Sequence, residues 1–102
     1  MAAYILVEIE VTDPIGYEEY KQLAPASIAL FGGKYLVRGG PTECLEGAWP
    51  SKRLVILEFS DADKARAWWD SREYRPARDL RQRTARADML LVEGLPAQPG
   101  KS

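Results

Sequence analysis

The sequence predicts an α+β fold in which a four-stranded antiparallel sheet carries helices on one face only. Residues 4–11 and 53–60 are apolar runs typical of strands, and residues 34–40 and 87–95 supply two further β patterns. Helical periodicity separates the first strand from the second and the third from the fourth. The 102 residues, 46% hydrophobic and 28% charged, fit a single domain over residues 1–95, and residues 96–102 are expected to form a disordered tail.

The first half of the chain predicts a strand, a helix and a second strand. In residues 4–11 the apolar side chains alternate, so one face of this strand is expected to be buried. Asp13 followed by Pro14 predicts a helix start, with a capping residue and then proline in the first turn. Pro25 is expected to break or kink this helix before a glycine pair ends it, because proline has no backbone N–H to donate.

The second half begins with an irregular, turn-rich arm over residues 41–52, followed by a central strand over residues 53–60. Ser60 and Asp63 resemble a capping box that would open the next helix.

After an interruption at Ser71, a further helix is predicted to run to about residue 85, with Pro76 in its first turn. Residues 87–95 then supply the last strand. The resulting order, β-α-β-β-α-β, is that of the ferredoxin-like fold.

One face of such a sheet has no helices, and here it would expose aliphatic side chains. Apolar surface of this extent is unfavourable in water, at roughly 25 cal/mol for each Å². A second copy of the chain could cover it, so the sequence predicts a homodimer. The side chains expected on this open face are Leu6, Leu54, Ile56 and Leu91, mixed with Glu8, Glu10 and Glu58.

Composition restricts the chemistry. Cys44 is the only cysteine and there is no histidine, so no disulfide, metal or haem site is expected, and no cofactor is predicted. The net charge of −1 does not favour nucleic-acid binding. No membrane span or signal peptide is apparent, which leads us to expect a cytoplasmic protein.

Three residues are candidates for catalysis. Arg38 could clamp an anion or a carbonyl group, although an ion pair with a strand glutamate is an equal alternative. Glu58 lies in a very apolar strand, where its pKa could rise, but structural pairing with arginine is the favoured interpretation. Tyr74 belongs to a set of aromatics whose simplest role is core packing. The predicted pocket lining is Tyr17, Tyr20, Arg38, Trp68, Tyr74 and Arg81.

A resemblance to a known family extends over nearly the whole chain. The motifs that carry it are TDPIGYEEY, GGKYLVRGG, LEG, RLVILEFSD and WWDSREYRPARDLR, in that order. Together they resemble the bacterial proteins grouped as domain of unknown function family 1330, which is similar in fold to the dimeric α+β barrel superfamily. That superfamily includes antibiotic-biosynthesis monooxygenases and muconolactone isomerases. The resemblance implies the fold and a dimer, but no particular reaction.

Three functions remain open at the level of sequence. The pocket could belong to a cofactor-free enzyme that performs proton transfer or oxygenation on a small oxygenated or aromatic metabolite. It could instead bind a metabolite without turnover, or the interior could be filled in a purely structural dimerisation module.

Overall fold

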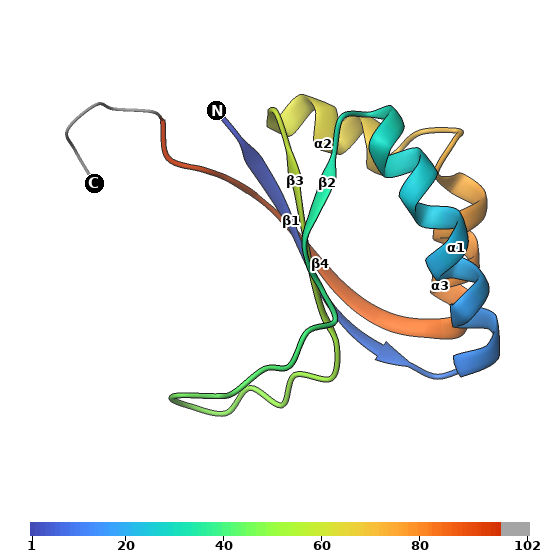
Figure 1. The fold of residues 1–102 in the computed structure, drawn as a ribbon, viewed down its shortest axis with the longest axis vertical. Helices are drawn as coiled ribbons and strands as arrows, with labels where there is room; N and C mark the ends of the chain where they lie inside the picture. The colour runs from blue at the N-terminus through green and yellow to red at the C-terminus, as the bar shows by residue number, and fades with distance from the viewer. Residues whose placement is uncertain (97–102) are drawn as a thin grey trace.

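The structure, a computed structural model, describes residues 1–96, so nearly all of the tail predicted for residues 96–102 lies outside the described residues. A four-stranded antiparallel sheet has the order β2-β3-β1-β4, and the helices cover one of its faces (Figure 1). The predicted ferredoxin-like fold is confirmed. The elements are β1 (Ala3–Val11), α1 (Pro14–Leu30), β2 (Lys34–Arg38), β3 (Leu54–Phe59), α2 (Ala62–Trp69), α3 (Arg75–Thr84) and β4 (Ala85–Glu93).

The core lies between the sheet and the helices. The alternation in β1 places Ile5, Val7 and Ile9 in this layer, as predicted, and each is almost fully buried. Trp68 at the end of α2 packs against Phe59 and Tyr74, with ring centroids 5.6 and 4.1 Å away. Burying large aromatic rings contributes strongly to the stability of a domain this small.

Pro25 was expected to break or kink helix α1, but the helix is continuous over residues 14–30, so it is not broken there. Proline removes one backbone hydrogen bond from a helix, the one that would end on the carbonyl four residues earlier. Here that carbonyl belongs to Lys21, and it accepts a hydrogen bond from the Arg38 guanidinium at 2.7 Å instead. The replacement partner satisfies the backbone group that the proline leaves free.

Two other predicted boundaries need correction. Asp61, rather than Ser60, caps α2, since its carboxylate accepts a hydrogen bond from the backbone N–H of Lys64 at 2.7 Å. Strand β4 begins at Ala85, two residues earlier than predicted, directly after α3.

The open face of the sheet differs from the prediction at one position. Leu91 pairs with Ile5 across β1 and β4, and paired residues point to the same side, so Leu91 faces the helices. The neighbouring residues Leu90 and Val92 occupy the open face instead and are 67% and 46% exposed. The pairing register with β1 decides which residues of β4 face the helices, because a shift of one residue exchanges the two faces of a strand.

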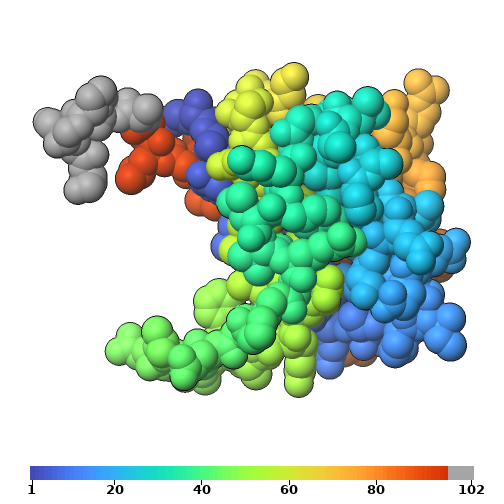
Figure 2. Space-filling model, in the orientation of Figure 1, coloured from blue at the N-terminus to red at the C-terminus, as the bar shows by residue number. Residues whose placement is uncertain are grey.

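The segment between β2 and β3, residues 39–53, forms an arm that projects to the side of the sheet away from the helices (Figure 1). Together with the end of β4, it borders a hollow on that side of the molecule (Figure 2). The Glu8 carboxylate holds the base of the arm, since it accepts hydrogen bonds from the Trp49 indole and the Lys52 backbone, both at 2.9 Å. Burial alone would raise the pKa of Glu8, but these donors outweigh it and lower the pKa below its usual 4.5.

None of the helices within residues 1–96 has the length and apolar character required to cross a membrane.

Candidate functional site

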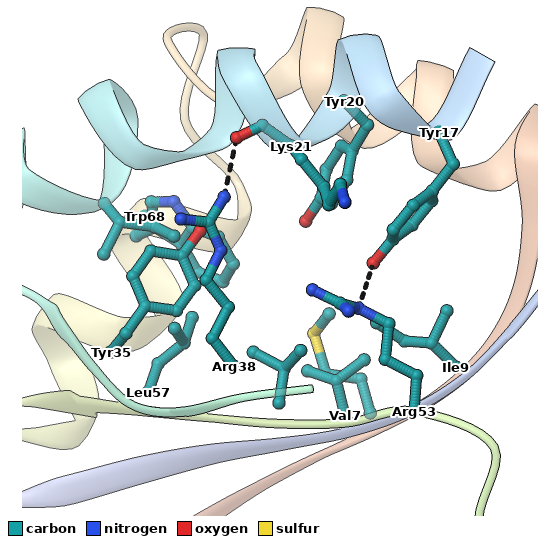
Figure 3. Close-up of a pocket in the computed structure, with 13 residues that line it drawn as sticks. Val7, Ile9, Tyr17, Tyr20, Lys21, Tyr35, Arg38, Arg53, Leu57 and Trp68 are labelled. Atoms are coloured by element: carbon teal, nitrogen blue, oxygen red, sulfur yellow. Dashed lines mark hydrogen bonds between the residues drawn. The ribbon is translucent and has the colours of Figure 1, made fainter. Parts of the chain in front are cut away.

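A small cavity lies between the inner face of the sheet and α1 (Figure 3). Its volume is about 20 Å³, which is room for roughly one water molecule. Aliphatic side chains of the sheet form the floor, and tyrosine, lysine and arginine side chains form the walls. The lining residues are Val7, Ile9, Tyr17, Tyr20, Lys21, Ile28, Tyr35, Arg38, Arg53, Val55, Leu57, Trp68 and Met89.

Arg38 reaches this cavity because of an irregularity in β2. Tyr35 pairs with Leu57 and Arg38 pairs with Val55, so the two residues between them lie opposite the single residue Ile56. This β-bulge puts Tyr35 and Arg38 on the same face, although regular alternation would put them on opposite faces. The Arg38 guanidinium then lies over the Tyr35 ring, 4.6 Å from its centroid.

Arg53 enters the cavity from the start of β3. Its Nε donates to the Tyr17 hydroxyl at 3.2 Å, and its guanidinium lies 5.6 Å from the centre of that ring. Gly39 makes this position possible, since a Cβ atom there would lie 2.2 Å from Arg53 Nη1. Gly39 also has a φ of +73°, which glycine adopts readily. Gly39 therefore leaves room for the Arg53 side chain.

The Tyr20 hydroxyl points into the space between Arg38 and Arg53 (Figure 3). It lies 3.1 Å from the Tyr74 hydroxyl, which in turn accepts a hydrogen bond from Arg81 Nε at 3.3 Å. Burial, together with the nearby Tyr74, raises the pKa of Tyr20 far above its ordinary value. The Tyr20 phenol is therefore neutral at any physiological pH and acts as a hydrogen-bonding group rather than as a base.

The arginines of this region have no carboxylate partners. Within residues 1–96, none of Arg38, Arg53 and Arg81 forms an ion pair with an Asp or Glu at 4.0 Å or less. Arg81 is only 5% exposed. Lys21, by contrast, is paired with Glu18 at 2.8 Å. An uncompensated cluster of guanidiniums next to a cavity favours anions, because burying unpaired charge is costly.

The sequence of the chain identifies its family. The profile of the domain of unknown function DUF1330 matches residues 2–95. The protein belongs to the DUF1330 family. No curated protein matches this DUF1330 chain.

Solved structures with the same fold include a protein of unknown function from Rhodopseudomonas palustris. It is 16% identical to the DUF1330 chain, with a TM-score of 0.74. The match covers 94% of the DUF1330 chain and 84% of the Rhodopseudomonas palustris protein. SnoaB from Streptomyces nogalater, a cofactor-independent oxygenase, is 13% identical with a TM-score of 0.61, over 96% and 97% of the two chains. HapK from Hahella chejuensis is 13% identical with a TM-score of 0.57, over 98% and 99%. At these identities the likeness shows the fold alone.

The DUF1330 structure brings most of the candidate residues together. Tyr17, Tyr20, Arg38 and Trp68 line the cavity. Tyr74 and Arg81 are not among the lining residues: the Tyr74 hydroxyl contacts the Tyr20 hydroxyl, and Arg81 donates to the Tyr74 hydroxyl. Trp69, the neighbour of Trp68 in the sequence, is 39% exposed and lies outside the cavity, where its ring stacks against Arg78.

Glu58 lies apart from the cavity, on the open face of the sheet. It pairs with Tyr4 across β1 and β3, and its carboxylate forms an ion pair with Lys34 at 3.2 Å. Within the described residues its ion-pair partner is therefore a lysine rather than an arginine.

Tyr35, Lys21 and Met89 line the cavity but were absent from the predicted lining. Tyr35 could not have been inferred from Arg38, because regular alternation would put the two side chains on opposite faces and only the bulge in β2 puts them on the same face. Arg53 also lines the cavity and was absent from the predicted lining. Its side-chain partner is the Tyr17 hydroxyl.

Proposed function

We propose that the protein binds a small oxygenated metabolite in the cavity between the sheet and α1 of each subunit of a homodimer. One observation carries the proposal: two guanidiniums and a tyrosine hydroxyl converge on a cavity that no carboxylate of the described residues lines. Hydrogen-bond donors fixed around an apolar floor are typical of small-molecule sites, where they determine the orientation of the ligand.

The chemistry that this arrangement supports best is stabilisation of negative charge on a ligand oxygen. Donors that are already in place can stabilise an oxyanion as it develops, and in a water-poor site this effect is large. A phenol or enol that reacts with oxygen without a cofactor must carry such charge. The same fold in a cofactor-independent oxygenase, SnoaB, makes this reaction class the first to test.

Proton transfer by a pocket carboxylate is less well supported, since neither Asp nor Glu lines the cavity. Tyr20 remains protonated, so it can donate a hydrogen bond to the ligand but is a poor general base. The site is therefore better suited to ligands that are already ionised when they bind. Binding without turnover is the second candidate function, and the same donors favour it.

The proposal is tested by measuring the melting temperature of the protein with small phenols, quinols and aromatic acids, then analysing products in air and under nitrogen. Bound ligand raises the melting temperature by mass action. A stabilising compound that is consumed only in air supports oxygenation, and one that is never consumed supports binding. If no compound stabilises the protein and a crystal structure shows a filled interior, both functions are contradicted.

A further inference from the structure

We infer that the cavity recognises a small carboxylate, held between the guanidiniums of Arg38 and Arg53. The inference rests on the proposed small-molecule function of this cavity and names the class of ligand that it takes. The observations behind it are the charge of the walls, the acceptors that the two arginines now use, and the size and polarity of the space between them.

The guanidiniums of Arg38 and Arg53 have N–H groups that are available to a ligand. Each guanidinium carries five N–H groups, in a planar fork that matches the two oxygens of a carboxylate. Within residues 1–96, the guanidinium of Arg38 makes one hydrogen bond, to the Lys21 carbonyl, and that of Arg53 makes one, to the Tyr17 hydroxyl. Both acceptors are neutral, so the positive charges stay uncompensated until an anion enters.

The Lys21 carbonyl oxygen accepts the hydrogen bond from Arg38 that a ligand oxygen would accept. Pro25 leaves this carbonyl without its helical donor, and Arg38 reaches across the cavity to bind it at 2.7 Å (Figure 3). Arg38 is itself exposed, so it can turn away from Lys21 without disturbing the core. A carboxylate offers Arg38 a charged acceptor in exchange for a neutral one, and charge-assisted hydrogen bonds are the stronger type.

The cavity also limits the size and shape of the ligand. With Arg38 on Lys21 its volume is about 20 Å³, so a ligand needs the room that the arginine vacates. Below the guanidiniums, the floor is aliphatic and includes Val7, Val55 and Leu57. A short carboxylate with an apolar remainder matches both the charged wall and this floor, whereas a phosphate or a polyanion would place charge against the aliphatic side chains.

Acetate and acetamide make a matched pair of probes, since they have nearly the same shape but differ in charge. Each is titrated into the uniformly ¹⁵N-labelled protein in chloride-free buffer, and the Nε–H resonances of the arginines and the Trp68 indole resonance are followed. We expect acetate to shift the Arg38 and Arg53 resonances saturably and to bind at least roughly tenfold more tightly than acetamide, as expected for hydrogen bonds between charged groups.

Variants locate the binding. Arg38→Gln and Arg53→Gln should each weaken acetate binding by roughly tenfold or more, and Arg53→Lys should show whether the fork as well as the charge is needed. Arg72→Gln removes an exposed arginine outside the cavity and should leave the affinity unchanged. Because Arg38 is exposed, Arg38→Gln keeps the test valid even if the Arg53 variants fail to fold.

The outcomes separate the two proposals. If acetate and acetamide bind equally and both shift the Trp68 indole resonance, carboxylate recognition is overturned but the small-molecule pocket stands. If acetate affinity is the same in Arg38→Gln, Arg53→Gln and the unchanged protein, the anion binds elsewhere and the inference is also overturned. If neither probe shifts any resonance of the cavity, the pocket function fails together with the inference.

Discussion

At the scale of single residues, the least usual feature is Arg81, a buried arginine whose Nε donates to a tyrosine hydroxyl. Its acceptor, Tyr74, is fully buried and also lies 3.1 Å from the Tyr20 hydroxyl. An unpaired buried charge is costly, so this group of three side chains is not explained by stability alone. Arg81 instead orients the Tyr74 hydroxyl, and through it the Tyr20 hydroxyl that points into the cavity.

Tyr74→Phe removes the acceptor of Arg81 Nε and the partner of Tyr20. We expect the free energy of unfolding to fall by about 1–3 kcal/mol, the usual cost of leaving a buried polar group unsatisfied. Chemical denaturation measures this change. Tyr4→Phe is the matched control, since the Tyr4 side chain lies on the open face, and it should be nearly neutral.

A double-mutant cycle identifies the source of the loss. In an Arg81→Met background there is no buried guanidinium left to satisfy, so Tyr74→Phe should cost clearly less than it does alone. Equal costs in the two backgrounds would show that the Arg81–Tyr74 hydrogen bond does not determine the effect.

Glu8 gives the base of the arm a dependence on pH. The pKa of a carboxylate that accepts hydrogen bonds is lower in the folded protein than in the unfolded chain, and here it lies below the usual 4.5. Stability from such a group is fully present above the unfolded pKa and is lost as the pH falls through the folded pKa.

We therefore expect the fluorescence of Trp49, which donates to Glu8, to change reversibly below pH 4.5, before the domain unfolds. Glu8→Gln, which cannot titrate, should abolish this step. The signal is assigned with Trp49→Phe, because the chain has two other tryptophans. A step that persists in Glu8→Gln would assign the titration to another group.

At the scale of elements, Pro25 and Arg38 act on the same carbonyl. Pro25→Ala supplies the missing N–H to the Lys21 carbonyl, and alanine is also the better helix former by about 3 kcal/mol in an ordinary helix interior. We expect the melting temperature to rise and the Arg38 Nε resonance to move toward that of a free side chain. Ala26→Ser changes an exposed neighbour without adding a backbone N–H and serves as the control. An unchanged Arg38 resonance would show that the proline does not position this arginine.

The strands and helices differ in how far sequence could predict them. Alternation correctly predicted the buried face of β1, and two residues of the predicted lining, Tyr74 and Arg81, are in contact with each other. The bulge in β2 has no local signature, because Leu36 and Val37 are ordinary strand residues, yet it decides that Arg38 faces the cavity. Predicting Arg38 as a site residue was therefore possible from its type but not from its position.

The errors at helix α1 and strand β4 have a common origin in tertiary contacts. Proline breaks a helix when the carbonyl that it leaves free has no other partner, and sequence alone does not show that Arg38, 17 residues away from Lys21, supplies one. The boundary of β4 is likewise set by pairing with β1, which begins at Ala85 opposite Val11. Local patterns predict which elements form, whereas long-range contacts determine where they end.

At the scale of the whole molecule, one side of the sheet is covered by helices and the other is hollow between the arm and the end of β4 (Figure 2). The hollow side carries Leu90 and Val92, and the arm adds Leu45 and Trp49, which are 89% and 58% exposed. Apolar surface of this kind is rarely left in water by a monomeric protein. Since β1 and β3 also turn aliphatic side chains to this face, a second sheet is the best match in shape and chemistry.

We therefore expect a homodimer in which the open faces pack together, and Leu90→Glu should dissociate it by placing a charge in the buried contact. Sedimentation velocity over a range of concentrations measures the change, and circular dichroism checks that the variant remains folded. Ile15→Glu is the control, because Ile15 is even more exposed, at 87%, but lies in the first turn of α1, on the helix side. This variant should remain dimeric. If the unchanged protein sediments as a monomer at micromolar concentrations, no second copy covers the apolar hollow. If the Leu90→Glu variant stays dimeric, the dimer contact lies elsewhere on the surface.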